Sequence, residues 1–269
     1  MPMQPMDHPL NLTMQAVLTY GSWGLTLVLI GVAVAMGLRE RTPFYVLMVL
    51  AAMVAAFAEP LYDAGLVLYF YSTHGMFTHF TAFGVPQPIW THSGYAVLYA
   101  SAAIFIARAI HRGTLTDRGL YAFAGLELLM SAAFEMVGIN GGTYEYWGPH
   151  VFRILKYPLV IGVLEAAQVI CFAVAAALLR KYATRPWHLL GLFVLFPCTF
   201  FMANFGAGAP TIIALHLDHP SSSVVAVASV LSILAAASLI RAAAAMLPLA
   251  SGPVSPTPAE PEPVRADHR

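Results

Sequence analysis

Long runs of apolar residues, separated by short polar segments, extend along almost the whole chain. An α-helix needs about 20 predominantly apolar residues to cross the core of a bilayer, and seven runs approach that length. Charged residues and proline separate the runs, as in the segment 39–43. We place the predicted spans at residues 15–37, 43–70, 88–110, 118–139, 157–180, 186–215 and 221–247. The pattern predicts an all-α fold, a polytopic membrane helix bundle with about seven transmembrane helices.

The composition agrees with a membrane location. Hydrophobic residues make up 59% of the 269 residues and charged residues only 10%, and the mean hydropathy is +0.73. Soluble domains carry about 25% charged residues, so this chain has too few charges to cover a water-exposed surface. We therefore expect a multi-pass integral membrane protein whose surroundings are the lipid bilayer, the cell membrane if the host is bacterial. The net charge is zero and no basic patch indicates a nucleic-acid partner.

The basic residues predict an orientation and a domain boundary. Of 13 lysines and arginines, eleven fall on one side of the predicted spans, and only Arg153 and Lys156 fall on the other. Because basic residues favour the cytoplasmic side, we expect the N-terminus outside and the C-terminus in the cytoplasm. Residues 1–249 are predicted to form the seven-helix domain. The Pro-rich, polar segment 250–269 is predicted to be a disordered cytoplasmic tail.

Two of the predicted outward loops are rich in aromatic residues. The segment 69–88 has no lysine or arginine and begins with Tyr69, and the segment 140–157 contains Tyr144, Tyr146 and Trp147 next to Glu145. Aromatic belts at the membrane interface account for some of these rings. A lid over an apolar substrate accounts for them equally well, so both interpretations stay open.

Several polar side chains are predicted to reach a common depth in the membrane. Counting 1.5 Å per helical residue, three of them lie roughly 25 Å from the inner boundary, namely Glu59, Glu135 and Asn204. Three others, counted inward from the outer side, reach the middle or outer half of the core: His92, Glu165 and Gln168. Ionisable residues at membrane depth are candidates for function. The alternative for the three glutamates and Gln168 is a structural hydrogen bond between helices. The alternative for Asn204 is to tie down an unwound helix.

The second predicted span offers a pair of acids. Glu59 and Asp63 are four residues apart, so their side chains share one helical face. Pro60 removes a backbone hydrogen bond and favours a kink between them. Two carboxyl groups in an apolar medium cannot both ionise at low cost, so one is expected to hold a proton and serve as a general acid. Alternatively, Asp63 is interfacial and Glu59 bonds to another helix.

Motifs for several other functions are missing from the sequence. It has no Asp-Asp-x-x-Asp motif for a magnesium-bound diphosphate, no clustered histidines, no Gly-rich phosphate loop and no Cys/His zinc spacing. The seventh span has no lysine that could bind retinal. We therefore expect neither a metal nor an organic cofactor.

Two resemblances narrow the chemistry. The pattern Glu135-x-x-Gly138-x-x-x-Gly142-x-Tyr144-x-Tyr146, with Pro158-Leu159-x-Ile161 after it, resembles a stretch of the bacterial carotenoid hydratases. The seven spans with acids in the second are similar to the integral-membrane terpene cyclases of meroterpenoid pathways, although the second acid of that family lies in a late helix and the seventh span here has none. Both resemblances imply that a carboxylic acid protonates an isoprenoid alkene or epoxide and that aromatic rings stabilise the cation.

The leading hypothesis is a membrane-embedded isoprenoid cyclase or hydratase without a cofactor. Glu59 or Glu135 would be the acid, and Asp63 would tune or reprotonate it. The final proton would go to Glu165, Gln168 or His92, directly or through water. The candidates to line the pocket are Tyr69, Tyr95, Tyr144, Tyr146 and Trp147, and Glu145 and Asn204 are further candidates for substrate contact. A sterol-type double-bond isomerase and a non-enzymatic protein that binds or transports lipid are the alternatives. The sequence leaves the oligomeric state open.

Overall fold

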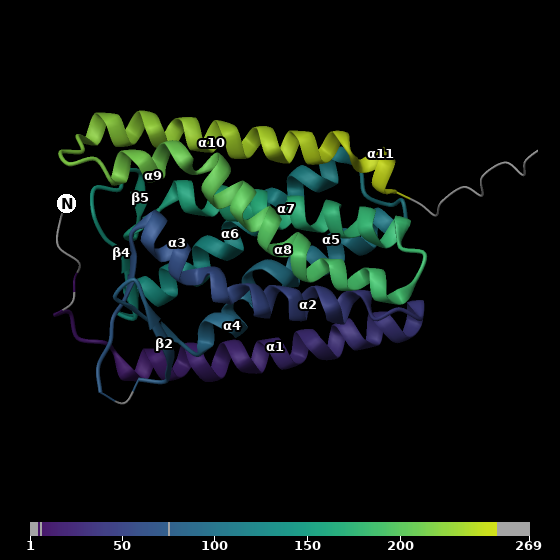
Figure 1. The fold of residues 1–269 in the computed structure, drawn as a ribbon, viewed down its shortest axis with the longest axis horizontal. Coiled ribbons are helices and arrows are strands. Elements are labelled where there is room, and N and C mark those ends of the chain that lie inside the picture. Colours follow the sequence, from purple (N-terminus) through teal and green to yellow (C-terminus); the bar gives the residue numbers. More distant parts are fainter. Residues whose placement is uncertain (1–4, 6, 75, 252–269) are drawn as a thin grey trace, which may run out of the picture.

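The computed structural model describes residues 5, 7–74 and 76–251, and its long helices run side by side along one axis (Figure 1). Within these residues, seven helical segments are long and apolar enough to cross a membrane. Their bounds are Leu12–Glu40, Phe44–Leu66, Trp90–His111, Asp117–Asn140, Leu159–Tyr182, Pro186–Ala207 and Ser222–Ala245. The predicted all-α bundle of seven spans is therefore confirmed.

Four of the spans are continuous helices and three are interrupted. The continuous ones are α1 (Leu12–Glu40), α6 (Asp117–Asn140), α7 (Leu159–Tyr182) and α10 (Ser222–Ala245), which the short α11 (Leu247–Ala250) follows. The second span consists of α2 (Phe44–Ala55), a 3-10 turn η1 (Ala56–Ala58) and α3 (Glu59–Leu66). The third consists of α4 (Trp90–Tyr95), a π-helical segment η2 (Ala96–Ala100) and α5 (Ser101–His111). The sixth consists of η3 (Pro186–Gly191), α8 (Leu192–Phe201) and a π-helical η4 (Met202–Ala207), before α9 (Ala209–Leu215).

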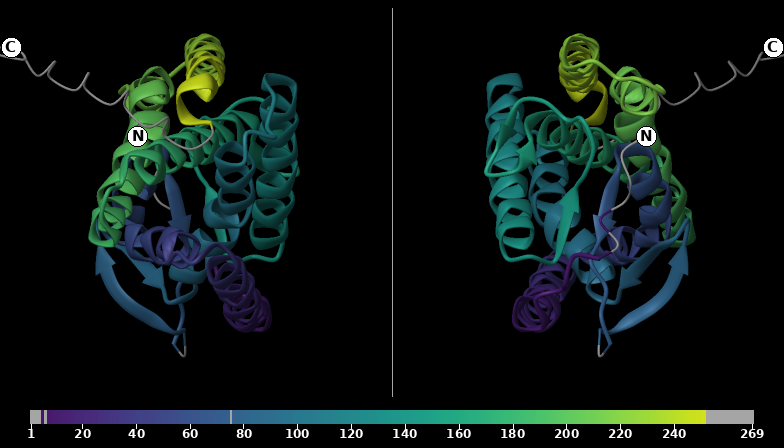
Figure 2. Two further views of the ribbon diagram at one scale, coloured as in Figure 1. Left: turned by 90° about the vertical axis from the view of Figure 1, so that its right-hand side faces the viewer. Right: turned by 90° about the vertical axis from the view of Figure 1, so that its left-hand side faces the viewer.

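The fifth span is the central helix of the bundle. Its helix α7 packs against α5, α6, α8 and α10, whereas α1 and α10 lie on opposite sides of the molecule (Figure 2). Most of the side chains of α7 are buried, including Glu165 and Gln168. Many of the buried ones are alanines, and small side chains allow helices to approach closely in a membrane. Polar groups on α7 are thus held away from lipid.

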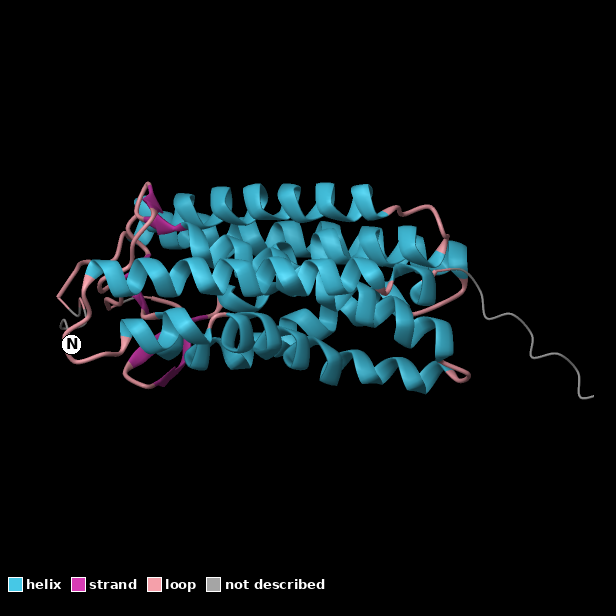
Figure 3. Ribbon diagram, turned by 90° about the horizontal axis from the view of Figure 1, so that it is seen from above, coloured by secondary structure: helices cyan, strands magenta, loops and turns pink. Residues whose placement is uncertain are grey.

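The two aromatic segments that were predicted as outward loops contain short strands. Strand β1 (Leu68–Phe70) pairs in antiparallel fashion with β4 (Tyr144–Tyr146), which joins the two segments. Strand β2 (Thr78–Ala82) forms a hairpin with β3 (Val85–Pro88), and β5 (Arg153–Ile154) pairs with β6 (Tyr157–Pro158). All six strands lie at one end of the bundle (Figure 3). The second helical span accordingly ends at Leu66 and not at the predicted residue 70.

The two ends of the described chain lie at opposite ends of the bundle (Figure 1). The end with Ser251 therefore also carries the connections between the first and second, third and fourth, and fifth and sixth spans. These are the connections that contain most of the basic residues. Which end faces the cytoplasm stays a prediction, and the predicted disordered tail lies mostly in 252–269, outside the described residues.

Gly138, in the last turn of α6, lets the strand β4 pack against that helix. A Cβ atom at Gly138 would lie 2.7 Å from the hydroxyl oxygen of Tyr144, which is closer than atoms can approach without moving. Gly125 lies on the same helix, and a Cβ atom there would meet no atom within 4 Å. The absence of a side chain at Gly138 thus leaves the space that the Tyr144 ring occupies.

We expect Gly138→Ala to lower the thermal stability of the detergent-solubilised protein, because the added methyl group displaces Tyr144. Overpacking of a tight contact costs typically about 1–3 kcal/mol. The control Gly125→Ala places the same methyl group in open space and is expected to preserve or raise stability. Equal midpoints of thermal unfolding for the two variants would contradict this account of Gly138.

Candidate active site

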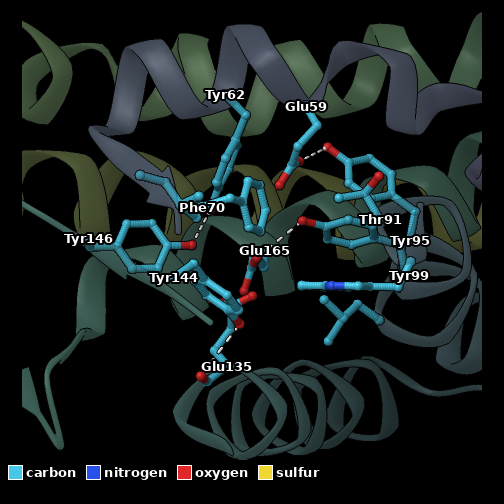
Figure 4. Close-up of a pocket in the computed structure, with 14 residues that line it drawn as sticks. Glu59, Tyr62, Phe70, Thr91, Tyr95, Tyr99, Glu135, Tyr144, Tyr146 and Glu165 are labelled. Atoms are coloured by element: carbon cyan, nitrogen blue, oxygen red, sulfur yellow. Dashed lines mark hydrogen bonds between the residues drawn. The ribbon is translucent and has the colours of Figure 1, made fainter. Parts of the chain in front are cut away.

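A small internal cavity lies in the half of the bundle nearest the strands (Figure 4). Four of the spanning segments and the strands β1 and β4 form its wall, and most of the lining side chains are acidic or aromatic. The acidic ones are Glu59, Glu135 and Glu165. Five of the aromatic ones are tyrosines: Tyr62, Tyr95, Tyr99, Tyr144 and Tyr146. Three carboxyl groups from three different helices thus face one aromatic cavity.

Glu165 accepts the largest number of hydrogen bonds in the site. The hydroxyl groups of Tyr99 and Tyr157 each donate to its carboxyl oxygens at 3.1 Å, and Ser131 donates as well. These donors come from η2, β6 and α6, so the carboxyl group ties three elements to α7. Hydrogen bonds to a carboxylate favour its charged form. Among the three acids of the cavity, Glu165 is therefore the best suited to accept a proton.

Glu59 has a single hydrogen bond to its carboxyl group. Tyr95 donates from its hydroxyl to Oε2 at 2.6 Å (Figure 4). The break at η1 places Glu59 in the first turn of α3, and Tyr62, three residues later, lines the same cavity. Tyr95 lies at the end of α4, directly before the π-helical segment η2. Helix interruptions in two neighbouring spans therefore position this pair.

Glu135 has the least satisfied carboxyl group of the three. Its Oε2 atom is buried without a hydrogen-bond partner among the described residues. Tyr144 donates to the backbone oxygen of Glu135 at 3.4 Å, and the hydroxyls of Tyr146 and Tyr62 lie 3.1 Å apart, so the two tyrosine hydroxyls next to the Glu135 carboxyl group also have other partners. A buried carboxyl oxygen without a donor to stabilise its charge favours the neutral, proton-carrying form of the group. Glu135 is thus the best candidate for a proton donor.

The electrostatics of the cavity are those of acids without counter-charges. Among the described residues that line it there is no Lys, Arg or His. Several carboxylates cannot all stay ionised in such an environment, because each charge raises the cost of the next. Burial, with the nearby Glu135 as the next cause, raises the pKa of both Tyr144 and Tyr146 well above the ordinary value. These hydroxyls therefore stay neutral and can donate hydrogen bonds.

The cavity is closed down to a volume of about 20 Å³. About 10–15 Å³ of such space suffices for one water molecule, whereas sites for drug-sized ligands measure roughly 300–1,000 Å³. A lipid can enter only if surrounding side chains or elements move. Among the residues that the structure describes, no group of three or more His, Cys, Asp and Glu side chains is placed to hold a metal ion.

No family model, curated protein or solved structure matches the chain. Its function therefore has to be inferred from the cavity itself.

The structure brings together six of the residues singled out from the sequence. These are Glu59, Tyr95, Glu135, Tyr144, Tyr146 and Glu165. The other residues predicted for the site do not line the cavity: Asp63, Tyr69, His92, Glu145, Trp147, Gln168 and Asn204. For those on helices, the rotation of the helix about its axis directs the side chain elsewhere, and Tyr69 and Glu145 lie in strands.

Hydrogen bonds show what three of these residues do instead. Asp63 accepts a hydrogen bond from the Gln87 amide of β3 at 2.5 Å, so the predicted Glu59–Asp63 pair does not share the cavity. His92 contacts the backbone oxygen of Met53 at 2.8 Å. Asn204 donates to the backbone oxygen of Phe200, one turn earlier in its own span, at 3.1 Å. Each of the three therefore has a structural contact.

Sequence reasoning missed several hydroxyl groups of the site. Tyr62 and Tyr99 had a usable signal, because they follow Glu59 and Tyr95 by three and four residues on the same helical faces. Ser131 likewise precedes Glu135 by four. Tyr157 gave no such signal, since it lies in a strand that the helical pattern does not predict.

We expect Glu165→Gln to destabilise the protein more than Glu135→Gln. The amide at position 165 would direct an NH₂ group at hydroxyls that now donate, and loss of hydrogen bonds to a charged group costs about 1.5–3 kcal/mol. Glu135→Gln leaves the three hydrogen bonds of Glu165 in place and changes a carboxyl group that already has an oxygen without a partner, so it serves as the control. Thermal unfolding in detergent measures the difference, and a larger loss for Glu135→Gln would contradict the assigned hydrogen bonding.

Proposed function

We propose that this protein is a membrane-embedded enzyme that protonates an alkene or epoxide of an isoprenoid-type lipid. The observation that carries the proposal is the meeting of Glu59, Glu135 and Glu165 at an aromatic cavity whose described lining has no cationic side chain. Acids of this kind can retain a proton at neutral pH, and a retained proton is what general-acid catalysis on an unactivated substrate needs.

Glu135 is the proton donor in this proposal. Its proton and the π electrons of the substrate double bond form a new C–H bond, which leaves a carbocation in the substrate and a carboxylate on Glu135. On an epoxide, the proton goes to the oxygen and the C–O bond breaks. Glu59 is the second candidate donor, because its carboxyl group lines the same cavity and accepts only one hydrogen bond, from Tyr95.

The aromatic rings around the acids would stabilise the carbocation. Tyr62, Tyr99 and Trp90 line the cavity, and the face of an aromatic ring attracts a cation by about 0.5–2 kcal/mol. A closed cavity also limits water, which would otherwise capture the cation at random. The small volume therefore suits the reactive state, provided that the site opens to admit the substrate.

Glu165 is the proton acceptor that completes the reaction. In cyclisation, a second double bond attacks the cation and the final cation loses a proton to Glu165, so substrate and product are isomers. In hydration, a water oxygen attacks the cation and its surplus proton goes to Glu165, so the product gains one water. Ser131 lies one turn from Glu135 on α6 and donates to Glu165, which offers a route for the proton to return.

One observation favours a second candidate function. The cavity of about 20 Å³ holds no lipid in its closed form, and hydrogen bonds to Glu59 and Glu165 also join helices. A protein that binds or transports a lipid without changing it could use the same polar groups for packing and recognition.

A double-bond isomerase would use the same protonation as the cyclase or hydratase.

We expect deletion of the gene and Glu135→Gln to accumulate the same lipid precursor in the native host. Loss of a general acid lowers a rate typically 10²–10⁴-fold. Glu127→Gln is the matched control, because Glu127 is a buried acid on the same helix that does not line the cavity. Mass spectrometry of the lipids at equal expression measures precursor and product.

The mass difference then separates the candidate reactions. A product of equal mass indicates cyclisation or isomerisation, and a product heavier by one water indicates hydration. Normal turnover by both Glu135→Gln and Glu59→Gln would contradict the assigned acids. A deletion that changes no lipid would contradict catalysis and favour the binding function.

A further inference from the structure

Glu40 organises the end of the bundle opposite the cavity. Its carboxyl group accepts hydrogen bonds from Arg108 at 2.8 Å, Arg112 at 3.0 Å and Arg180 at 2.9 Å, and from the hydroxyl of Tyr45 at 2.5 Å. Arg108 lies in α5, Arg112 follows the end of α5 and Arg180 lies in α7, while Glu40 ends α1. One negative charge therefore faces three positive charges, which leaves a surplus of two.

A polar pocket of about 250 Å³ lies beside this cluster. Three arginines line it, Arg41, Arg180 and Arg185, and no acidic residue does so among the described residues. Arg41 and Arg185 are exposed and have no ion pair in the described part of the chain. Two threonine hydroxyls add further donors to the lining. Two arginines without an ion pair, Arg41 and Arg185, and the paired Arg180 thus meet at one pocket.

Two features of the pocket are typical of a site built for an anion. The guanidinium group of Arg180 lies 5.1 Å from the centre of the Phe44 ring and 5.2 Å from that of Tyr45, and its side chain is only 10% exposed. It is therefore held in place before any ligand arrives. His111 also lines the pocket, and its buried Nδ1 atom has no hydrogen-bond partner among the described residues.

An apolar groove of about 410 Å³ adjoins the pocket. Val34, Leu38 and Val46 of α1 and α2 line it, and it shares Arg41, Thr42 and Pro43 with the basic pocket. A Cβ atom at Gly37 would lie 2.6 Å from the backbone oxygen of Thr42, so this glycine allows the tight turn between the two helices. A phosphate in the pocket and a hydrocarbon chain in the groove would belong to one molecule.

We propose that this end of the bundle binds an anionic phospholipid, with the phosphate between Arg41, Arg180 and Arg185 and an acyl chain in the groove along α1 and α2. Arginine pairs with phosphate through forked hydrogen bonds. Free phosphate offers the same charge, but only a lipid also covers the groove. The site shares no residue with the cavity, so it stands independently of the proposed enzymatic function.

The test measures lipid selectivity of the full-length protein in detergent by native mass spectrometry. Phosphatidylglycerol and phosphatidylcholine with identical chains are offered in equal amounts, and the ratio of the retained lipids is determined. Arg41→Gln and Arg185→Gln are the test variants, since both side chains are exposed and their replacement breaks no ion pair. Arg118→Gln is the control, because Arg118 is exposed at the same end and lies outside the pocket.

The wild type is expected to prefer phosphatidylglycerol, and each test variant is expected to reduce that preference about fivefold, the effect of one basic residue near an anionic lipid. Arg118→Gln is expected to leave it unchanged. An equal reduction by Arg118→Gln would overturn the site in favour of diffuse surface charge. Wild-type retention without preference would also overturn it.

Two further arms distinguish a lipid from free phosphate. Inorganic phosphate in large excess is expected to leave the bound phosphatidylglycerol in place, and displacement of the lipid would overturn the lipid assignment. Val34→Trp, which fills the groove without altering charge, is expected to weaken retention of long-chain but not of short-chain phosphatidylglycerol. Equal retention of both by this variant would overturn the assignment of the groove.

Discussion

Burial of three carboxyl groups without a counter-charge is the constraint on which the rest of the structure depends. A buried charge that has no partner costs several kcal/mol, and this bundle supplies hydroxyl groups instead of cations. Glu165 alone takes hydrogen bonds from Tyr99, Tyr157 and Ser131. Hydroxyl groups stabilise a carboxylate but still allow it to take up a proton, whereas an adjacent arginine would hold it permanently ionised. The arrangement therefore preserves the capacity to exchange a proton.

The same requirement explains why regular helices are interrupted around the cavity. An unbroken helix repeats every 3.6 residues, so it directs few side chains to a single point. The 3-10 turn η1 and the π-helical η2 change the rotation of the second and third spans next to Glu59 and Tyr95. π-helical segments occur frequently at functional sites. The pairing of β1 with β4 then brings Tyr144 and Tyr146 over the end of the cavity, where no helix could place both.

This geometry decides which features of the fold and of the cavity can be predicted from the sequence. Seven apolar runs predict the seven spans, and counting residues along a helix places Glu59, Glu135 and Glu165 near one level, which agrees with their meeting at one cavity. The rotation of each span about its axis depends on its breaks and on its neighbours. Asp63 therefore pairs with Gln87 of a strand rather than with Glu59 in the cavity. Short strands in a membrane chain carry too weak a pattern to reveal such partners.

A comparison of Glu40 and Glu165 shows how the same type of side chain, a glutamate, serves two purposes in one bundle. Glu40 meets Arg108, Arg112 and Arg180, and the resulting ion pairs join the ends of α1, α5 and α7. The desolvation cost of a charged side chain is low at that end because water and lipid headgroups can solvate it. Arginine beside Glu165 would also satisfy the carboxylate, but it would repel the carbocation that the proposed reaction forms. The described lining of the cavity contains acids and no cationic side chain, and the arginines that pair with Glu40 lie at the opposite end of the bundle, an arrangement that suits the cationic intermediate of the proposed reaction.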